Sequence, residues 1–466
     1  MPSAVIPDPV PGLLARAAER LAGQFADLPP TSAPTPETLA SMAEILDETA
    51  QRLGNNYPYF HPLYAGQMLK PPHPIARAAY ALAMAINPNN HARDGGRASS
   101  EMEMEAVAHI ARMFGWQSPD LLGHLTSSGT IANLEALWVA GQIANQARPG
   151  QRILGSSQAH YTHSRISAVL KLRYDSVPAD RHGRMDLDAL ESELKKGDVG
   201  TVVATLGTTA MGAVDPLDRI LELQARYRFR IHVDAAYGGY FKLIAEALDE
   251  PARRAFGAMD QADSIVVDPH KHGLQPYGCG CILFRDPAVG RFYKHDSPYT
   301  YFTSTELHLG EISLECSRAG SAAVALWATH RLLPLTPGGA FANGLAAGRR
   351  AALDLYSRLA ADGQCVPPSA GAPELDIVVW KIAAASLEES SRRAQRIFDA
   401  CARHNLHLAL VQLPQSWFEP TAIAGRHEAV PLITCLRSVL MKPEHEDWLS
   451  RIWNEYQAAS REEPGT

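Results

Sequence analysis

The segment that carries the most distinctive lysine of this sequence reads Ser264-Ile-Val-Val-Asp-Pro-His-Lys-His-Gly273. Its apolar run predicts a buried strand over Ser264–Asp268. Lys271 follows the carboxyl end of that strand, which is where open α/β sheets bind ligands. Desolvation at such a place would lower the pKa of an amine and make it nucleophilic. A buried structural lysine is the alternative when the segment is taken alone.

Similar apolar runs alternate with helical patterns over the first two thirds of the chain. The predicted strands are Gly123–Thr126, Arg152–Gly155, Thr201–Leu206, Arg230–Asp234, Ser264–Asp268 and Gly280–Phe284. Helical periodicity lies between and around them, at Pro74–Ile86, Ser99–Phe114, Asn133–Gln146, Leu217–Tyr227 and Ala319–Leu333. This alternation predicts an α/β fold with a mainly parallel sheet covered by helices.

Three parts of the chain are distinguished by these patterns. Residues 1–60 carry two amphipathic helical patterns and are expected to form an N-terminal helical arm, and residues 61–333 a large domain. The stretch Pro334–Gly339 looks like a hinge and begins a small C-terminal α/β domain, residues 334–466. The elements predicted in that domain are strands Glu374–Ile382, His407–Leu413 and Pro431–Leu440 and a helix Glu444–Ala458.

The composition excludes several classes of partner. The 466 residues are 46% apolar and carry a formal charge of −7 without a basic stripe, so nucleic acid is not expected to bind. No apolar run approaches the roughly 20 residues of a membrane span, and the start lacks a secretory-signal pattern. We therefore expect no membrane partner and a cytoplasmic location. Six cysteines without a framework spacing fit free thiols in a reducing compartment.

A second strand pattern ends in a carboxylate, in Arg230-Ile-His-Val-Asp-Ala-Ala-Tyr-Gly-Gly239. Asp234 at that place is suited to keeping a pyridine nitrogen protonated, and Ala236 leaves room for a flat ring to lie against it. An aspartate that caps the turn is the alternative reading of this segment.

A hydroxyl-rich turn opens a predicted helix in Leu125-Thr-Ser-Ser-Gly-Thr-Ile-Ala-Asn133. Gly129 and Thr130 would place N–H groups and a hydroxyl at the helix N-terminus, where the helix dipole favours a phosphate dianion. An ordinary Ser/Thr cap looks similar. Two further segments supply His160, which is able to stack on a ring, and Thr209.

Histidine pairs raise the alternative of zinc. His160 with His163, or His270 with His272, could ligate a metal. No acidic or thiol ligand lies at a helpful spacing, so no metal site is predicted.

Together these segments resemble the group II decarboxylases, the pyridoxal-phosphate (PLP) dependent amino-acid decarboxylases of fold type I that include aromatic amino-acid, tyrosine and glutamate decarboxylases. The resemblance covers roughly residues 59–333 and rests on five motifs in the family's order. It implies a PLP-dependent transferase-like fold, with a mainly parallel seven-stranded-type sheet in a large domain and a small α/β domain. It also implies PLP as cofactor, and a homodimer with active sites at the interface.

The same resemblance implies roles for individual residues. Lys271 would bind PLP covalently, and the implied cofactor contacts are Ser128, Gly129, Thr130, His160, Thr209, Asp234, Ala236, His270 and Lys271. The implied catalytic residues are Lys271, His160, Asp234 and Tyr299, with Tyr299 as proton donor and Tyr301 in reserve. The chain departs from the family where Ser128-Gly-Thr-Ile131 replaces the common Gly-Gly-Ser-Glu, and where His272 replaces a frequent aromatic residue.

The expected reaction is removal of the α-carboxylate of an L-amino acid to give an amine and CO2. A PLP carbon–carbon lyase or aldolase of the sphingosine-phosphate-lyase kind is the rival. Candidate substrate contacts are Tyr64, Arg93, Arg97 and Arg318. Arg93 and Arg97 would suit an acidic or phosphonate side chain, although exposed arginines paired with nearby glutamates are the favoured reading. Arg318 could serve substrate, phosphate or a structural ion pair.

Overall fold

The computed structural model describes residues 10–92, 95–117, 122–294, 312–419 and 431–462. Its larger sheet has the strand order β1-β7-β6-β5-β4-β2-β3. The strands are β1 (Leu122–Thr126), β2 (Arg152–Ser156), β3 (Arg173–Val177), β4 (Val199–Thr205), β5 (Arg230–Asp234), β6 (Ser264–Val267) and β7 (Gly280–Phe284). Only β7 runs antiparallel to its neighbours β1 and β6. The predicted mainly parallel α/β sheet is confirmed.

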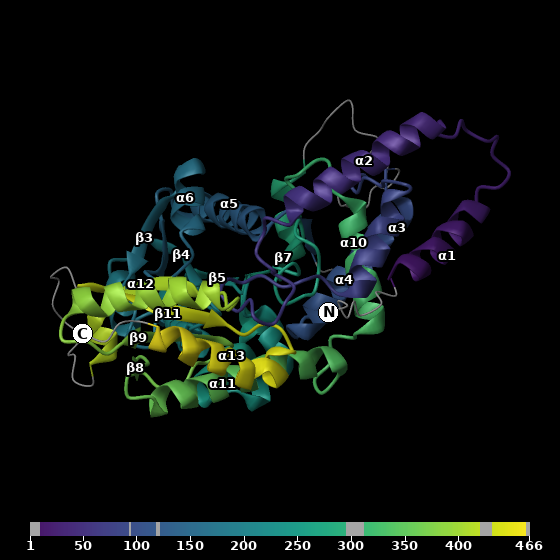
Figure 1. Ribbon diagram of the computed structural model, residues 1–466. Helices are drawn as coiled ribbons and strands as arrows, with labels where there is room; N and C mark the ends of the chain where they lie inside the picture. The colour runs from purple at the N-terminus through teal and green to yellow at the C-terminus, as the bar shows by residue number, and fades with distance from the viewer. Residues whose placement is uncertain (1–9, 93–94, 118–121, 295–311, 420–430, 463–466) are drawn as a thin grey trace.

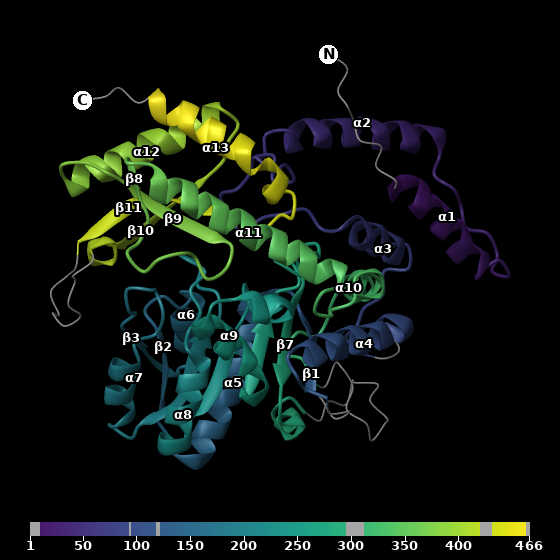
Figure 2. The same cartoon turned by 90° about the horizontal axis from the view of Figure 1, so that it is seen from below.

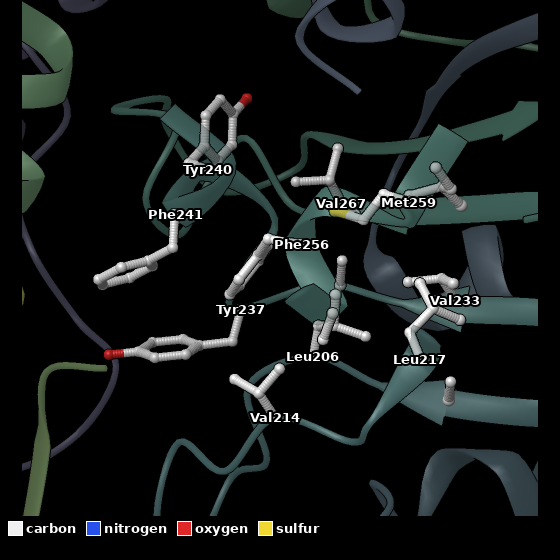
Figure 3. Packing of buried hydrophobic residues seen from close by; sticks show 14 of the residues in the cluster. Leu206, Val214, Leu217, Val233, Tyr237, Tyr240, Phe241, Phe256, Met259 and Val267 are labelled. Atoms are coloured by element: carbon white, nitrogen blue, oxygen red, sulfur yellow. The ribbon is translucent and has the colours of Figure 1, made fainter. Parts of the chain in front are cut away.

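Both faces of this sheet are buried, which explains the unbroken apolar runs of its central strands. Ile265 and Val267 of β6 belong to the cluster on one face, while Val266 belongs to the cluster on the other. Figure 3 shows part of the first cluster, where Val233 and Val267 meet residues such as Phe256 and Met259. Side chains alternate between the faces because successive residues of a strand point in opposite directions.

Helices cover the two faces. On one face α5 (Gly129–Ala147) contacts β1, β4, β5, β6 and β7 and packs against α6 (Thr162–Val169). The remaining helices of this part are α3 (Pro74–Met84), α4 (Arg97–Met113), α7 (Leu187–Leu194), α8 (Leu217–Tyr227), α9 (Glu250–Gly257) and α10 (Gly320–Leu332), with the 3-10 segments Gly239–Ala247, Met259–Gln261 and Pro287–Phe292. Helix α10 packs on both α3 and α4, beside β7 and β1 in Figure 2.

The C-terminal region forms a second, antiparallel sheet of order β10-β11-β9-β8. Its elements are α11 (Ala340–Ala361), β8 (Cys365–Val366), β9 (Ile377–Ile382), α12 (Leu387–Arg403), β10 (Ala409–Pro414), a 3-10 turn (Gln415–Phe418), β11 (Leu432–Val439) and α13 (His445–Arg461). In Figure 2 this sheet and its helices lie over one end of the larger sheet. Leu63 and Ala65 pack into its core, although they fall inside the range predicted for the large domain, whose limits stay a prediction.

The N-terminal segment contributes α1 (Val10–Gly23) and α2 (Pro36–Leu53). Helix α2 has no buried residue and extends away from the rest of the chain (Figure 1). Its apolar side chains are nevertheless large: Leu39, Met42, Ile45 and Leu46 are each at least half exposed. None of the helices in the described ranges is both long and apolar enough to cross a bilayer.

Element limits differ from expectation in a few places. Helix α4 begins at Arg97, two residues before the predicted start at Ser99, so Ser99 and Ser100 lie inside its first turn, where both are buried. Ser99 is held there because its hydroxyl donates to Asn90 Oδ1 at 2.5 Å. Strands β3 and β8 and helices α6, α9, α11 and α12 are additional to the predicted elements.

Candidate active site

A cavity of about 200 Å³ lies where strands β4, β5 and β6 end. All nine residues predicted to contact a cofactor line it: Ser128, Gly129, Thr130, His160, Thr209, Asp234, Ala236, His270 and Lys271. They come from five separate segments, which the parallel strands bring together at one edge of the sheet. Asn133, Tyr237 and Asp268 line it too, and no role was predicted for them.

Asp234 ends β5 as a buried, ionised carboxylate. Its Oδ2 is 2.8 Å from Nε2 of His163, and its Oδ1 accepts from the Ala236 N–H at 3.1 Å. Burial alone would raise the pKa of Asp234, but the His163 hydrogen bond and the charges of His163 and Lys271 hold that pKa well below its usual range. The carboxylate therefore offers a fixed negative charge at the cavity wall.

Lys271 lies in the turn after β6 and points its amine into the same cavity. Its Nζ is 2.9 Å from Oδ2 of Asp268, the residue that follows β6. Asp268 is 2% exposed, and its Oδ1 has no hydrogen-bond partner among the described residues. His270 fixes the turn, because its backbone N–H and its ring Nδ1 both donate to the Cys279 carbonyl, at 3.1 and 2.8 Å.

The N-terminus of α5 closes another side of the cavity. Ser128 is its N-cap, and the Ser128 Oγ accepts from the Ile131 N–H at 3.3 Å. The N–H groups of the first turn lack intrahelical acceptors, so this end favours an anion. A Cβ at Gly129 would lie 2.5 Å from both carboxylate oxygens of Asp268, so the position admits glycine alone.

His160 lies beside Asp234 and Lys271, which both influence its ionisation. Its Nδ1 accepts from the Thr162 N–H at 3.3 Å and is 2.6 Å from the Thr162 hydroxyl. Because Nδ1 is an acceptor, the ring proton is on Nε2. Burial lowers the pKa of His160, which favours a neutral ring that can lie against a flat cofactor.

Asp376, a buried residue just before β9, lies behind the wall of this cavity. Tyr237 lines the cavity and donates its hydroxyl to Asp376 Oδ1 at 2.5 Å; in Figure 3 that hydroxyl points away from the apolar cluster. The Nε2 of His272, next to Lys271, is 3.3 Å from Asp376 Oδ2. Burial raises the pKa of Asp376 to about 6.

The predicted substrate residues are not gathered in this way. Tyr64 is buried against His407, and Arg97 is exposed at the start of α4. Arg318 pairs with the buried Glu103 and donates to the carbonyls of Leu125 and Asn90 at 3.0 and 2.8 Å. These contacts favour the structural ion pair among its three roles. Arg93, Tyr299 and Tyr301 lie outside the described residues.

A family model, the pyridoxal-dependent decarboxylase conserved domain, matches residues 31–362. The chain belongs to this family. Its cofactor is therefore pyridoxal phosphate.

Named relatives agree with that membership. The L-tyrosine decarboxylase of Enterococcus faecium is 30% identical over 404 residues, which cover 65% of this chain and 65% of the relative. A probable L-tyrosine/L-aspartate decarboxylase of Methanothermobacter thermautotrophicus is 30% identical over 266 residues, 56% of this chain and 69% of that relative. The chain thus spans about 65% of the length of the tyrosine decarboxylase that it matches.

Two solved structures share the fold of this chain. Mouse CSAD superimposes with a TM-score of 0.76 at 20% identity, over 95% of this chain and 91% of the other. Oryza sativa TDC, solved with PLP and tryptamine, gives a TM-score of 0.75 at 17% identity, over 98% and 99%. The predicted fold type I architecture is confirmed.

The cavity of this decarboxylase-family chain fits PLP. The α5 N-terminus with Gly129 and Thr130 suits the phosphate, Asp234 suits a protonated pyridine nitrogen, and Lys271 supplies the amine. The orphaned Oδ1 of Asp268 leaves an acceptor free for a polar group of the cofactor.

Proposed function

We propose that this chain removes the α-carboxylate of an L-amino acid, releasing CO2 and an amine. The observation that carries the proposal is the convergence of Lys271, Asp234 and His160 on one cavity in a chain of the pyridoxal-dependent decarboxylase family. The relatives named tyrosine and aspartate decarboxylases support decarboxylation over the lyase alternative.

Bound PLP supplies an electron sink for the negative charge that remains when the carboxylate leaves. Asp234 keeps a negative charge opposite the pyridine nitrogen, and His163 keeps Asp234 ionised. Lys271 presents the amine that would anchor the cofactor. His160, which lines the same cavity, would help to hold the cofactor ring. Proton delivery by Tyr299 stays part of the proposal.

The substrate class is also a proposal. The relatives' names suggest tyrosine or aspartate, and Arg97, exposed at the start of α4, is available to an acidic side chain. Because Arg318 is occupied by Glu103, we favour Arg97 over Arg318 for such a contact.

Product analysis tests the reaction. Purified holoenzyme is incubated in D2O with tyrosine, aspartate, glutamate or 2,4-diaminobutyrate, and CO2 and amine are quantified by gas and liquid chromatography with mass detection. We expect one amino acid to give equal amounts of both products, with one deuterium bound to the former α-carbon. Borohydride-reduced enzyme is the blank. An aldehyde product without CO2 would establish the lyase instead.

We further propose a homodimer in the cytoplasm. The apolar stripe of α2 supports the dimer, because Ile45 and Leu46 are 61% and 64% exposed, and exposed apolar patches of this kind mark protein interfaces. A second copy would bury them. The six cysteines are all free, which fits a reducing compartment.

Sedimentation equilibrium tests the dimer. The wild-type protein should have twice the 50.6 kDa mass of the chain. An Ile45→Glu/Leu46→Glu variant should shift towards monomer because it places charges in the apolar stripe. Glu44→Lys, on the polar side of the same helix, is the control and should remain dimeric. A monomeric wild-type protein would contradict the proposal.

A further inference from the structure

A second, larger cavity of about 510 Å³ lies between the large domain and the small domain. Its walls include Lys70, His73, His272, Phe341 and Lys442. It shares one turn with the cofactor cavity, because Lys271 lines the first cavity and its neighbour His272 lines the second. Neither the family match nor the proposed reaction assigns a role to this space.

Two lysines from distant segments bring ammonium groups to this cavity. Lys442 is 2% exposed; its Nζ donates to the Tyr64 carbonyl at 2.5 Å and lies 5.3 Å from the centre of the Tyr64 ring. Lys70 Nζ donates to the Met441 carbonyl at 3.3 Å. Within the described part of the chain neither ammonium has a carboxylate within 4.0 Å. Each keeps N–H donors that these carbonyls do not use.

Few carboxylates lie near the ammonium groups of Lys70 and Lys442. The nearby carboxylates are Glu444, which is exposed at the rim, and Asp376, which already accepts from Tyr237. Arg437 is 4% exposed close to Asp376, and its Nε and Nη2 have no hydrogen-bond partner among the described residues. Burial lowers the pKa of the imidazoles that surround the two lysines, namely His61, His73, His272 and His445.

His272 adds an unpartnered polar atom to the wall. The side chain is 1% exposed, and its Nδ1 has no hydrogen-bond partner among the described residues. Buried nitrogens without a partner are rare in native proteins, and such groups commonly meet a water or a ligand. Because Nε2 faces the Asp376 carboxylate and carries the proton of the neutral ring, Nδ1 is an acceptor, so it calls for a donor such as a water at the cavity wall.

We propose that this interdomain cavity binds a small oxyanion, a phosphate, sulfate or carboxylate group, between the ammonium groups of Lys70 and Lys442. The oxyanion supplies the negative charge that the cavity lacks and acceptors for the unused N–H donors. Lys70 and Lys442 belong to different domains, so the anion joins the two domains. It does so close to the cofactor turn, because His272 in the cavity wall adjoins Lys271. This proposal does not depend on which reaction the cofactor cavity catalyses.

Binding of the anion should take up protons. Burial lowers the pKa of Lys70 to about 8 and that of Lys442 to about 7, and Glu444 opposes the shift in both. A lysine is charged below its pKa, so the free cavity loses positive charge as the pH rises through 7 and 8. A bound anion stabilises the protonated forms, and its affinity should fall over the same range.

Isothermal titration of the PLP-loaded holoenzyme with sodium sulfate tests the proposal, because PLP then occupies the α5 phosphate site and the sulfate charge is constant over this range. If both lysines must be protonated, the affinity at pH 8.5 should be on the order of 100-fold weaker than at pH 6.5. At pH 7.5, titrations in buffers of different ionisation enthalpy should show net proton uptake.

Matched variants locate the site. Lys70→Met and Lys442→Met should each weaken sulfate binding at least tenfold and reduce its pH dependence. Lys195→Met, at the residue that follows α7 and whose side chain is 63% exposed, should change neither. If Lys442→Met fails to fold, Lys70→Met alone decides. Sulfate binding that is equal at both pH values, or unaffected by either substitution, would overturn the proposal.

Discussion

Replacing Lys271 with alanine should lower kcat by at least about 10³-fold, a loss of about 4 kcal/mol in transition-state stabilisation. The turn after β6 presents the amine of Lys271 to the cofactor cavity, where its Nζ lies 2.9 Å from Oδ2 of Asp268. Without it the cofactor has no covalent anchor, and the substrate amine has no amine to displace. PLP would remain only through the α5 N-terminus and Asp234, so we expect it to be lost on dialysis.

Borohydride reduction followed by peptide mass spectrometry reads out this attachment directly. Wild-type protein should carry the reduced cofactor on the peptide that contains Lys271, and the variant should carry none. Lys195→Ala, at the exposed lysine that follows α7, is the matched control and should keep both the label and the activity. Label on another lysine of the wild-type protein, or full activity of Lys271→Ala, would refute the assignment.

Replacing Asp234 with asparagine should lower kcat by about 10³-fold, again about 4 kcal/mol. Asparagine has nearly the same shape and still meets His163, so the loss reports on charge rather than packing. In the low-dielectric cavity a neutral amide no longer stabilises a protonated pyridine nitrogen, and the electron sink weakens. Because the pKa of Asp234 lies well below its usual range, Asp234 stays ionised between pH 5 and 8. Its titration should therefore cause no fall in kcat towards the acid end of that range.

A variant of His163 tests the other partner of the contact with Asp234. His163→Gln keeps a hydrogen-bond donor near Asp234 but removes the ring, and should cost about tenfold in kcat. Asp260→Asn, at an exposed carboxylate, is the control and should leave kcat unchanged. Steady-state kinetics and the PLP absorbance spectrum are measured for all three. Wild-type kcat in Asp234→Asn would show that the carboxylate does not act through its charge.

The principal site residues could be predicted because they follow buried strands. Asp234 and Lys271 each come just after an apolar run, and a polar residue at such a place is visible in the sequence. The fold followed from the same runs. Strand β3 was not predictable in this way, because it lies at the sheet edge and three of its five residues are exposed, which leaves little apolar signal. Helix α12 had a usable signal: Ser386 precedes Glu389 by three residues and accepts its N–H at 3.2 Å.

Other site residues had no local signal at all. His163 meets Asp234 across 71 positions of sequence, and only the strand order brings them together. Asp268 looked like the last residue of a strand, while its carboxylate lies against both Lys271 and Gly129. Asp376 lies just before β9 of the antiparallel sheet, 139 positions from Tyr237. Long-range partners of this kind require the three-dimensional structure.

The antiparallel placement of β7 bears on the order in which this protein folds. Because β6 and β7 pair directly, Val267 lies opposite Cys281, and the Lys271 turn is the loop of a hairpin rather than part of a long crossover. Hairpins form within about 1–10 μs because closing a short loop costs little chain entropy. The lysine turn can therefore take shape early, whereas the Asp234 contact with His163 must wait for the parallel strands to assemble. During folding of the apoprotein, the turn that carries Lys271 would thus form before the contact between Asp234 and His163.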